Sequence, residues 1–545
     1  MDVFILAAGI GSRLVKFTHD IIPKYLVNID NNTGLYYIIN YWSKYANNIY
    51  LVINSKYNII TTFYINNILI DHLSKIKIIN YDTNDGTAYT INHILNNELR
   101  NVKIDNLLIT WCDLYPIENI DFKKIPESNK NNNIFVFTHG DKCRYKLNKN
   151  SIIKEENGNI IGIYYFQNFK HFVLGDYCKN NDIVDYLEMV GTINQFEINN
   201  IIDYGDEDKL MKYLNNKTDN LLKCRYFNNI DIIDDNKLLK KGINDKGKEI
   251  IKFEKNWYKY ISELNNNDIN KYIPKIYNLF EFAILMEYKK NYIPVYIFLS
   301  NCDKNDNESI QTSINNANYN IIKITVLKNI INKVKILHSL KKKTESKAFF
   351  FSNLKKEIYD KIFERTKIIK DFLNYFGDIK IVNGIYIKSF DEIIEKCKQI
   401  ITTYYDTLDL YEYSIIFGDC QFSNILINPN DISDIIFIDP RGYFGDSNIY
   451  GPVEYDFAKI LYAISGYDSF NSKHFNIKKI DTNLQSLEFE IKGFYYDKNI
   501  INKYFNKIHK TYLVIIWLSL AEYNKNNIWK CLASYYYGLY LGTIL

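Results

Sequence analysis

The sequence predicts an α/β fold in a chain of at least two domains. Its 545 residues exceed what one hydrophobic core usually supports. Short apolar runs alternate with longer amphipathic segments in the first half, a rhythm typical of a mixed sheet covered by helices. The pattern restarts near residue 220 and becomes largely helical beyond residue 320. We therefore expect one domain at residues 1–220 and another at 221–545, with the boundary between residues 215 and 225.

Five apolar runs of strand length define the expected sheet of the first domain. They are Val3–Ala8, Ile49–Ile53, Ile76–Ile79, Leu107–Thr110 and Ile134–Phe137. Segments with helical character lie between several of these runs, so we expect helices to cover the sheet.

The second domain begins with a smaller set of predicted strands. Phe227–Ile233 and Lys237–Lys241 are expected to pair as a hairpin through the polar turn between them. A helix around Glu249–Ser262 follows, with two more strands near Ile276 and at Ile284–Glu287. This order predicts a bilobal α+β domain, with a small lobe at about 221–300 and a helical lobe at about 301–545. We expect the helical pattern to be broken only around residues 417–428 and 435–439.

Composition excludes several function classes. The net charge is +4, with 67 basic and 63 acidic side chains, which is too balanced to predict nucleic-acid or membrane binding. The eight cysteines include no CxxC pair, so neither a zinc site nor a disulfide framework is expected. The N-terminus lacks a basic targeting segment, and the apolar run Leu513–Ala521 is too short to cross a bilayer. We expect a cytoplasmic protein without membrane insertion.

A loop suited to phosphate binding follows the first predicted strand. Small residues in Leu6–Leu14 (LAAGIGSRL) let backbone N–H groups approach phosphate oxygens closely. Arg13 adds a fixed cation, and Lys24 in the run Pro23–Val27 adds a second. The residues expected to contact a nucleotide here are Ala7, Ala8, Gly9, Gly11, Ser12, Arg13 and Lys24.

This stretch resembles the signature of the sugar-phosphate nucleotidyltransferases, including relatives that act on phosphocholine. Gly86-Thr87-Ala88 is similar to the turn that those enzymes place against the nucleobase. Leu107–Asp113 is similar to their strand that ends in a metal-binding aspartate, and Asp203–Asp206 to the segment with the second metal carboxylate. Ile160–Phe166 is similar to the strand beside their acceptor pocket.

The resemblance implies a Rossmann-like nucleotidyltransferase domain with specific roles for these residues. Arg13 and Lys24 would be catalytic, Gly86 and Thr87 would bind the nucleotide, and Asp113 and Asp203 would bind Mg²⁺. An acceptor phosphate oxygen would attack the α-phosphorus of a nucleoside triphosphate and release pyrophosphate, while the protein positions and neutralises anions. Two carboxylates with phosphate oxygens are ligands that suit Mg²⁺.

Two positions depart from the family pattern. Cys112 precedes the metal aspartate, where most relatives have Gly or a small polar residue. The order of Lys154 and Glu155 is the reverse of the usual Glu-Lys pair, which leaves Lys154 doubtful as a ligand of the acceptor phosphate.

The segment Phe417–Asn428 (FGDCQFSNILIN) has the spacing of a kinase catalytic loop. Such a loop needs an Asp that accepts the proton of the attacking hydroxyl, an Asn about five positions later for Mg²⁺, and a second metal Asp after a neighbouring strand. Asp419, Asn424 and Asp439 match these three roles. His139-Gly140-Asp141 has the more usual triplet but is followed at the equivalent position by Lys146, a poor metal ligand.

The second half resembles the aminoglycoside phosphotransferase and choline kinase superfamily, specifically members found with surface-polysaccharide genes. The residues that carry this resemblance are Phe417–Leu426, Ile438–Gly445, Tyr450-Gly451 and Tyr455–Lys459. It implies a protein-kinase-like fold in which Lys240 or Lys241 binds the ATP phosphates and pairs with Glu254 on the following helix. Glu287 would lie in the hinge segment that contacts adenine. Alternation along a strand puts the two lysines on opposite faces, so the choice between them stays open.

Phe417 stands where this superfamily usually has His, and we expect the loop to be less well organised for that reason. Asp456, in a helix that follows a glycine-rich loop, is expected to brace the catalytic loop or cap backbone N–H groups.

Together the two resemblances predict a bifunctional enzyme that uses ATP, a second nucleoside triphosphate and Mg²⁺. The kinase would phosphorylate a sugar or small alcohol, and the nucleotidyltransferase would couple a sugar 1-phosphate or similar phosphate to a nucleotide. We favour a sugar because the segments at Gly86 and Gly162 look more like those of the sugar enzymes. A choline kinase joined to a CTP:phosphocholine cytidylyltransferase, and a transferase with a regulatory pseudokinase, remain alternatives. A homo-oligomer is left open.

Overall fold

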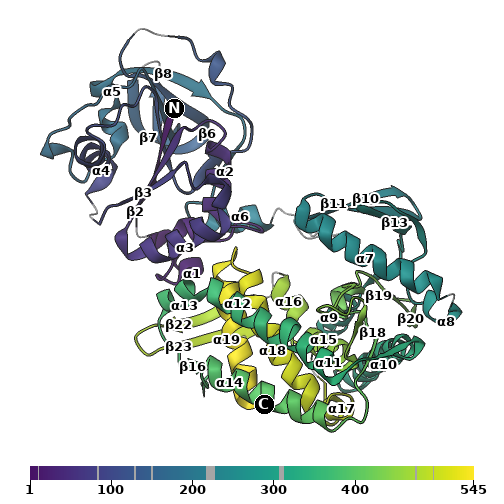
Figure 1. Ribbon diagram of the computed structural model, residues 1–545. Coiled ribbons are helices and arrows are strands. Elements are labelled where there is room, and N and C mark those ends of the chain that lie inside the picture. The colour runs from purple at the N-terminus through teal and green to yellow at the C-terminus, as the bar shows by residue number, and fades with distance from the viewer. Residues whose placement is uncertain are drawn as a thin grey trace. The chain divides into compact units, whose positions relative to one another are not determined.

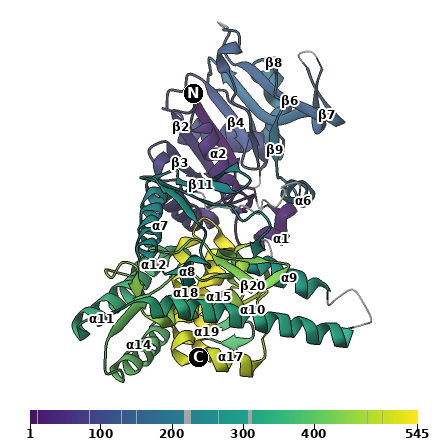
Figure 2. The ribbon, with the colours of Figure 1, turned by 90° about the vertical axis from the view of Figure 1, so that its right-hand side faces the viewer.

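The computed structural model (Figures 1 and 2) describes most of the chain, which divides into two compact units. The described residues are 1–9, 11–82, 85–127, 130–148, 151–215, 227–264, 266–305, 312–472, 475–494 and 496–545. Unit 1 comprises Met1–Thr218, Asp371–Phe376 and Asn524–Ile528; unit 2 comprises Asp219–Lys370, Gly377–Tyr523 and Trp529–Leu545. The chain as described is mixed α/β.

Unit 1 contains a 7-stranded mixed sheet in its described residues. In sheet order the strands are β3 (Ile76–Asn80), β2 (Asn48–Ile53), β1 (Asp2–Ala7), β4 (Leu107–Trp111), β7 (Ser151–Gln167), β6 (Asn133–Asn148) and β8 (Thr192–Glu197). The first four are parallel to one another, β7 is antiparallel to β4 and β6, and β6 is parallel to β8. The five expected strands and the mixed sheet are confirmed, although β6 extends well beyond its predicted end.

Helices connect the parallel strands of unit 1, as parallel pairing requires. The main ones are α2 (Gly34–Trp42), α3 (Asn58–Ile68) and α4 (Gly86–His93), with shorter helices α1 (Val15–Thr18), α5 (Leu187–Val190) and α6 (Glu207–Asn215). Every residue of β1 is buried, because helices cover both faces of the sheet at its centre. The loops that leave these central strands therefore start from a fixed position.

A short antiparallel pair, β5 (Leu114–Pro116) with β9 (Ile201–Asp203), joins two segments that are remote in sequence. Leu114 pairs with Asp203, and the backbone N–H of Tyr204 donates to the carbonyl of Asp113 at 3.1 Å. The buried Tyr204 hydroxyl donates to the Cys112 carbonyl at 2.5 Å. These contacts place Asp203 beside Asp113.

Unit 2 opens with a four-stranded antiparallel sheet and one long helix. In sheet order the strands are β10 (Asn228–Asp234), β11 (Lys237–Gly242), β13 (Ala283–Glu287) and β12 (Ile276–Leu279). Helix α7 (Asp245–Glu263) runs alongside this sheet (Figure 1), with Trp257 and Ile261 on its buried face. The expected hairpin, helix and two further strands are confirmed.

Most of unit 2 beyond residue 312 is helical. Its longest helices are α10 (Thr312–Leu340), α14 (Phe390–Asp406), α15 (Val453–Ile464), α18 (Lys507–Tyr523) and α19 (Ile528–Ile544). Figure 2 shows α10 running beside β20 (Asp431–Phe437). The shorter helices of unit 2 after residue 264 are α8 (Asn267–Asn270), α9 (Val295–Asn305), α11 (Lys347–Leu354), α12 (Lys361–Ile368), α16 (Tyr467–Asn471) and α17 (Lys498–Tyr504), whereas α13 (Lys370–Phe376) belongs to unit 1 except for its first residue. Within the described residues, no helix combines the length and the apolar character that a membrane span needs.

Short strands interrupt these helices at more places than the sequence predicted. One sheet consists of β14 (Ile293–Pro294), β19 (Ile425–Asn428) and β20, and another of β15 (Lys342–Thr344), β18 (Glu412–Ile415) and β21 (Tyr450–Gly451). A third contains β17 (Ile385–Tyr386), β16 (Ile381–Val382), β23 (Ser486–Ile491) and β22 (Phe475–Asp481). The expectation of only two interruptions is therefore wrong. In the β22–β23 hairpin, Leu487 and Phe489 alternate with polar residues and bury one face of the strand.

We predict that Gly34→Ala destabilises unit 1. A Cβ at position 34 would lie 1.8 Å from the hydroxyl oxygen of Tyr204, and that ring is fully buried and cannot move aside. Overpacking of this kind costs roughly 1–3 kcal/mol. Thermal unfolding of the full chain, followed by circular dichroism, should show a transition lowered by roughly 2–4 °C per kcal/mol. Gly9→Ala, where no atom lies within 4 Å of the added carbon, is the matched control and should melt like the wild type.

Candidate active sites

The loop after β1, which was expected to bind phosphate, meets Asp113 at one edge of the unit 1 sheet. Leu6 pairs with Trp111 in the parallel strands β1 and β4, and the Cys112 N–H donates to the Leu6 carbonyl at 3.2 Å. Because parallel strands end at the same edge, the loop after Ala7 and the turn at Asp113 are neighbours. Ala7 is buried, Ala8 partly buried and Gly9 exposed, so the backbone becomes accessible where the loop begins; Ile10 lies outside the described residues.

Lys24 is held against this loop and paired with Asp113. The Lys24 ammonium donates to Asp113 Oδ2 at 2.5 Å, and both side chains are largely buried. Gly11, at φ +78°, lets the loop pass close to Lys24: a Cβ there would lie 3.3 Å from Lys24 Cβ. Burial alone would lower the pKa of Lys24, but Cys112 and Asp113 raise it above its usual value, and the nearby Arg13 opposes that rise. Ser12 and the exposed Arg13 lie in the adjoining helical turn Ser12–Leu14.

Asp113 and Asp203 face the same small space. A Cβ on Gly205 would lie 2.8 Å from Asp113 Oδ2 and 3.2 Å from Asp203 Oδ1. Lys209 neutralises Asp203 through a contact of 2.5 Å, as Lys24 neutralises Asp113. Among the described residues no group of three or more His, Cys, Asp or Glu side chains could hold a metal ion. Two convergent carboxylates nevertheless fit Mg²⁺, which usually takes one or two carboxylates together with substrate phosphates.

Gly86 and Thr87 contact the segment Asn180–Ile183. They begin α4 and approach the segment Asn180–Ile183, where a Cβ on Gly86 would lie 2.6 Å from the Asn181 carbonyl oxygen. The Thr87 hydroxyl accepts from the Ile183 N–H at 2.9 Å and donates to Asp182 at 3.3 Å. These bonds give both residues a structural role and do not connect them to the pair of Lys24 and Asp113.

Two other positions singled out in the sequence of unit 1 have structural contacts. The His139 ring bonds to the Ile198 carbonyl at 2.9 Å, and the side chain of Asp141 lies outside the described part of the chain. Lys154 is exposed, with its ammonium 5.9 Å from the Tyr145 ring centroid. Neither is joined to the pair of Lys24 and Asp113 by these contacts.

In unit 2, Lys240 is the lysine that faces the interior. Its ammonium lies 2.7 Å from Glu254 Oε2 on α7 and 2.7 Å from Asp439 Oδ1. Lys241 points to the opposite face and pairs with Asp231 at the surface. Burial lowers the pKa of Lys240, but Asp439 and Glu254 outweigh burial and raise it. Burial raises the pKa of Glu254 to about 7 in spite of Lys240.

The loop after β18, where a kinase catalytic loop was expected, brings Asp419, Asn424 and Asp439 together through short contacts. The Asn424 amide donates to Asp419 Oδ2 at 3.2 Å and to the Asp419 carbonyl at 3.1 Å. The Ile438 N–H donates to the Asn424 carbonyl at 2.9 Å, which places Asp439 beside Asn424. Asp439 adopts φ +56° directly after β20, a conformation uncommon for a residue with a side chain and frequent at functional sites.

Asp456 braces this loop from the buried side. Its carboxylate accepts the N–H groups of Phe417 at 2.9 Å and Gly418 at 2.6 Å, and His338 on α10 contacts it at 3.0 Å. The bracing role expected for Asp456 is confirmed. The Phe417 ring stacks on Phe437 at a centroid distance of 4.6 Å, so apolar packing supports the loop where a histidine was expected.

Sequence reasoning missed two charged residues beside Asp419. Lys459 on α15 pairs with Asp419 Oδ1 at 2.9 Å, and Arg441 is joined by its backbone N–H to the Phe417 carbonyl at 2.8 Å. Lys459 lies one helical turn after Asp456, and this spacing could have placed it on the face toward the loop. The contacts of Arg441 depend on the folded path of the loop after β20 and leave no sequence signal.

Glu287 lies at the end of β13, where the hinge was expected. It pairs with Lys289 at 2.8 Å and accepts from the Lys275 N–H at 3.2 Å. With Tyr288 and Asn236 it lines an open depression of about 290 Å³. These contacts do not connect Glu287 to Lys240.

Many solved structures are similar to the N-terminal part of the chain, and three of them are given below. HddC from Yersinia pseudotuberculosis is 24% identical over 39% of this chain and 98% of that chain, with a TM-score of 0.32. A nucleoside-diphosphate-sugar pyrophosphorylase from Vibrio cholerae RC9 is 17% identical over 39% and 100% of the two chains, with a TM-score of 0.29. CTP:phosphocholine cytidylyltransferase from Streptococcus pneumoniae is 15% identical over 39% and 97%, with a TM-score of 0.28. No protein-family model and no curated protein matches. Similarity at this level identifies neither the substrate nor the activity.

We predict different outcomes for neutral substitutions of the two adjacent lysines. Lys240→Met leaves Glu254 buried without its cation, and breaking a buried ion pair costs roughly 3–5 kcal/mol. Lys241→Met removes only a surface pair and should leave the unfolding midpoint unchanged. Urea denaturation of both full-length variants compares them directly. Equal midpoints for the two variants would contradict the inward assignment of Lys240.

We also predict a pH-dependent stability from Asp468 on α16. This buried carboxyl accepts from the Ser423 N–H at 3.1 Å, and burial raises its pKa to about 7. The folded state therefore binds this proton more tightly than the unfolded state, so its contribution is complete below about pH 4 and is lost as the pH rises through 7. The free-energy difference between wild type and Asp468→Asn should change by up to about 1.4 kcal/mol per pH unit in that window. A constant difference would refute this assignment.

Proposed function

We propose that the protein is a bifunctional enzyme, with a nucleotidyltransferase in unit 1 and a small-molecule kinase in unit 2. The observation that carries the proposal is a buried lysine paired with an aspartate just beyond a strand, which occurs in both units. Lys24 pairs with Asp113 after β4, and Lys240 pairs with Asp439 after β20. Each pair combines a cation for phosphate oxygens with a carboxylate for a hard metal ion.

In unit 1 the residues would act mainly by binding and orienting anions. Backbone N–H groups of the loop at Ala8–Gly11, with Arg13 and Lys24, would hold the triphosphate while an acceptor phosphate oxygen attacks the α-phosphorus. The bond to pyrophosphate breaks as the new bond to the α-phosphorus forms. Asp113 and Asp203 would hold Mg²⁺, which neutralises phosphate charge when bound. The side chain of Lys24 is only 12% exposed, so little water must be removed for its ammonium to contact a phosphate.

In unit 2 the residues have the complementary roles of a kinase. Asp419 would accept the proton of the acceptor hydroxyl, whose oxygen attacks the γ-phosphorus of ATP, and ADP leaves. Lys240 would contact the phosphates, with Glu254 holding it in place. Asn424 and Asp439 would hold Mg²⁺ there. The bonds from the Asn424 amide keep Asp419 oriented before a substrate arrives.

The two reactions form a sequence that ends in an activated donor. A kinase makes a phosphate ester, and a nucleotidyltransferase couples such a phosphate to a nucleotide. We propose that the product is an NDP-sugar for glycan assembly, because the segments at Gly86 and Gly162 resemble those of the sugar enzymes more closely. Two alternatives must be distinguished from this proposal by experiment. In one the product is CDP-choline, and in the other the kinase unit is inactive and regulatory.

We predict that the two activities can be removed separately. Asp419→Ala should reduce ADP formation by ~10²–10⁴-fold, because general bases contribute rate factors of that size. The same variant should leave pyrophosphate release from a nucleoside triphosphate and a sugar phosphate unchanged. Asp113→Ala should show the reverse pattern. Coupled assays for ADP and for pyrophosphate on the full chain, with sugars, choline and each nucleoside triphosphate, measure both activities.

The control for these variants is Asp431→Ala, which removes an exposed carboxylate at the first position of β20. It should retain both activities. Wild-type protein that releases pyrophosphate but forms no ADP with any acceptor would indicate a regulatory kinase unit. Loss of both activities in either single variant would contradict two independent sites.

A further inference from the structure

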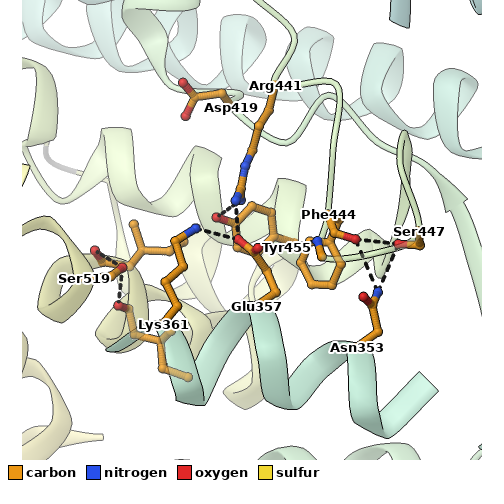
Figure 3. Close-up of polar contacts among 12 residues, drawn as sticks. Asn353, Glu357, Lys361, Asp419, Arg441, Phe444, Ser447, Tyr455 and Ser519 are labelled. Carbon is orange, nitrogen blue, oxygen red and sulfur yellow. Dashed lines mark hydrogen bonds and ion pairs between the residues drawn. The ribbon is translucent and has the colours of Figure 1, made fainter. Parts of the chain in front are cut away.

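Beside Asp419, cationic side chains outnumber the carboxylates that face them. Lys361, Arg441 and Lys459 share two partners, Glu357 and Asp419, and we call these five residues the cationic cluster. Arg441 extends from beside Asp419 to Glu357, where Lys361 also points (Figure 3). All five belong to unit 2.

One carboxylate serves two of these cations. Glu357 accepts from the Arg441 guanidinium and from the Lys361 ammonium, the latter at 2.8 Å. Burial alone would raise the pKa of Glu357, but Arg441 and Lys361 lower it to about 2, so Glu357 is ionised. It lies in a π-helical turn, Lys355–Asp360, between α11 and α12, and such turns frequently occur at functional sites.

The loop geometry holds Arg441 close to Asp419. Gly418 adopts φ +74°, and a Cβ there would lie 2.9 Å from Arg441 Cβ, so only glycine admits this approach. The guanidinium also donates to the Tyr455 hydroxyl at 2.8 Å and lies 4.2 Å from the Tyr443 ring centroid. Arg441 is therefore fixed in position before any ligand binds.

When all three cations are protonated, the cluster has one positive charge more than its two carboxylates neutralise. Burial and repulsion from Arg441 lower the pKa of Lys361 to about 7, despite its contact with Glu357. The three cations are nevertheless reachable, with side chains 12% exposed for Arg441, 13% for Lys459 and 26% for Lys361. An additional anion would compensate the excess charge, and charge-assisted hydrogen bonds of this kind are the stronger class.

We propose that the substrate phosphorylated by unit 2 is itself an anion, an alcohol that carries a phosphate or a carboxylate bound by Lys361, Arg441 and Lys459. This inference rests on the proposed kinase activity. In the reaction, the substrate hydroxyl loses its proton to Asp419, its oxygen forms a bond to the γ-phosphorus of ATP, and the bond to ADP breaks. The cationic cluster holds the anionic end of the substrate and so orients that hydroxyl.

The same charges oppose the alternative substrate. A quaternary ammonium such as choline is bound by aromatic faces or carboxylates, and like charges nearby cost binding free energy. Here the two carboxylates of the cluster are already engaged by cations. The charges of the cationic cluster therefore favour an anionic substrate of the kinase over choline.

Lys361→Met provides the test because the folded state already disfavours the charge of Lys361, so the variant should fold. Calorimetric titration of the full chain with inorganic phosphate should show affinity weakened by roughly 10–100-fold, the range expected for loss of one charge-assisted bond. ADP formation should be compared with glucose, glucose 6-phosphate, glucuronate and choline as acceptors. We expect an anionic acceptor to be preferred, with its KM raised by a similar factor in the variant and kcat within about threefold.

Lys355→Met is the matched control: it lies in the same π-helical turn, is exposed, and pairs only with Asp360 among the contacts of that turn. It should bind phosphate like the wild type. A preference for glucose 6-phosphate would identify the anionic group of the substrate as a phosphate, and a preference for glucuronate would identify it as a carboxylate. Unchanged phosphate affinity in Lys361→Met, or ADP formation with glucose or choline that exceeds both anionic acceptors, would overturn the inference. If glucose or choline is preferred, the kinase activity itself would stand. If none of the acceptors supports ADP formation, the kinase proposal would be refuted, and the phosphate affinities of the variants would then show whether the cationic cluster binds anions.

Discussion

The arrangement of both units depends on keeping a lysine ammonium charged away from water. Removing such a charge from water costs several kcal/mol unless a carboxylate lies within contact distance. Lys24 is held by Asp113, and Lys240 is held by Glu254 and Asp439. The two aspartates are distant in sequence from their lysines, Asp113 by 89 residues and Asp439 by 199, so the backbone on both sides must be fixed for each pair to exist. Burial of an ammonium is thereby coupled to the placement of an aspartate at the site.

The two units meet this constraint with different scaffolds. In unit 1, the parallel strands β1 and β4 place the loop after Ala7 and Asp113 at one sheet edge, and the short β5–β9 pair brings Asp203 to them. In unit 2, an antiparallel sheet and α7 orient Lys240, while the turn after β20 supplies Asp439. The cationic cluster extends the second site on the side of Asp419. Under the proposed kinase activity, the phosphates of ATP would lie beside Lys240 and the acceptor beside the cationic cluster.

Local patterns in the sequence were sufficient for most strands and for the residues at motif positions. Apolar runs and turn residues reflect the conformation of the chain within a few positions. The hairpin before α7 and the positions of Asp113 and Asp439 shortly after strands were therefore predictable. Alternation showed that one of Lys240 and Lys241 is buried but not which, because that depends on α7 and Asp439. The pair of Glu357 and Arg441, and the sheet that joins β16 to β23, require contacts between segments far apart. Gly86 and Thr87 matched a motif, yet their bonds serve the neighbouring loop.

The central claim is that each lysine-paired aspartate belongs to a separate site for a metal ion and a nucleotide. Mn²⁺, a paramagnetic substitute for Mg²⁺, allows these sites to be counted by electron paramagnetic resonance in the presence of non-hydrolysable nucleoside triphosphates. We expect two nucleotide-dependent binding sites per chain, one lost in Asp113→Asn and the other in Asp439→Asn. Retention of both sites in either variant, or loss of both in one, would contradict the account.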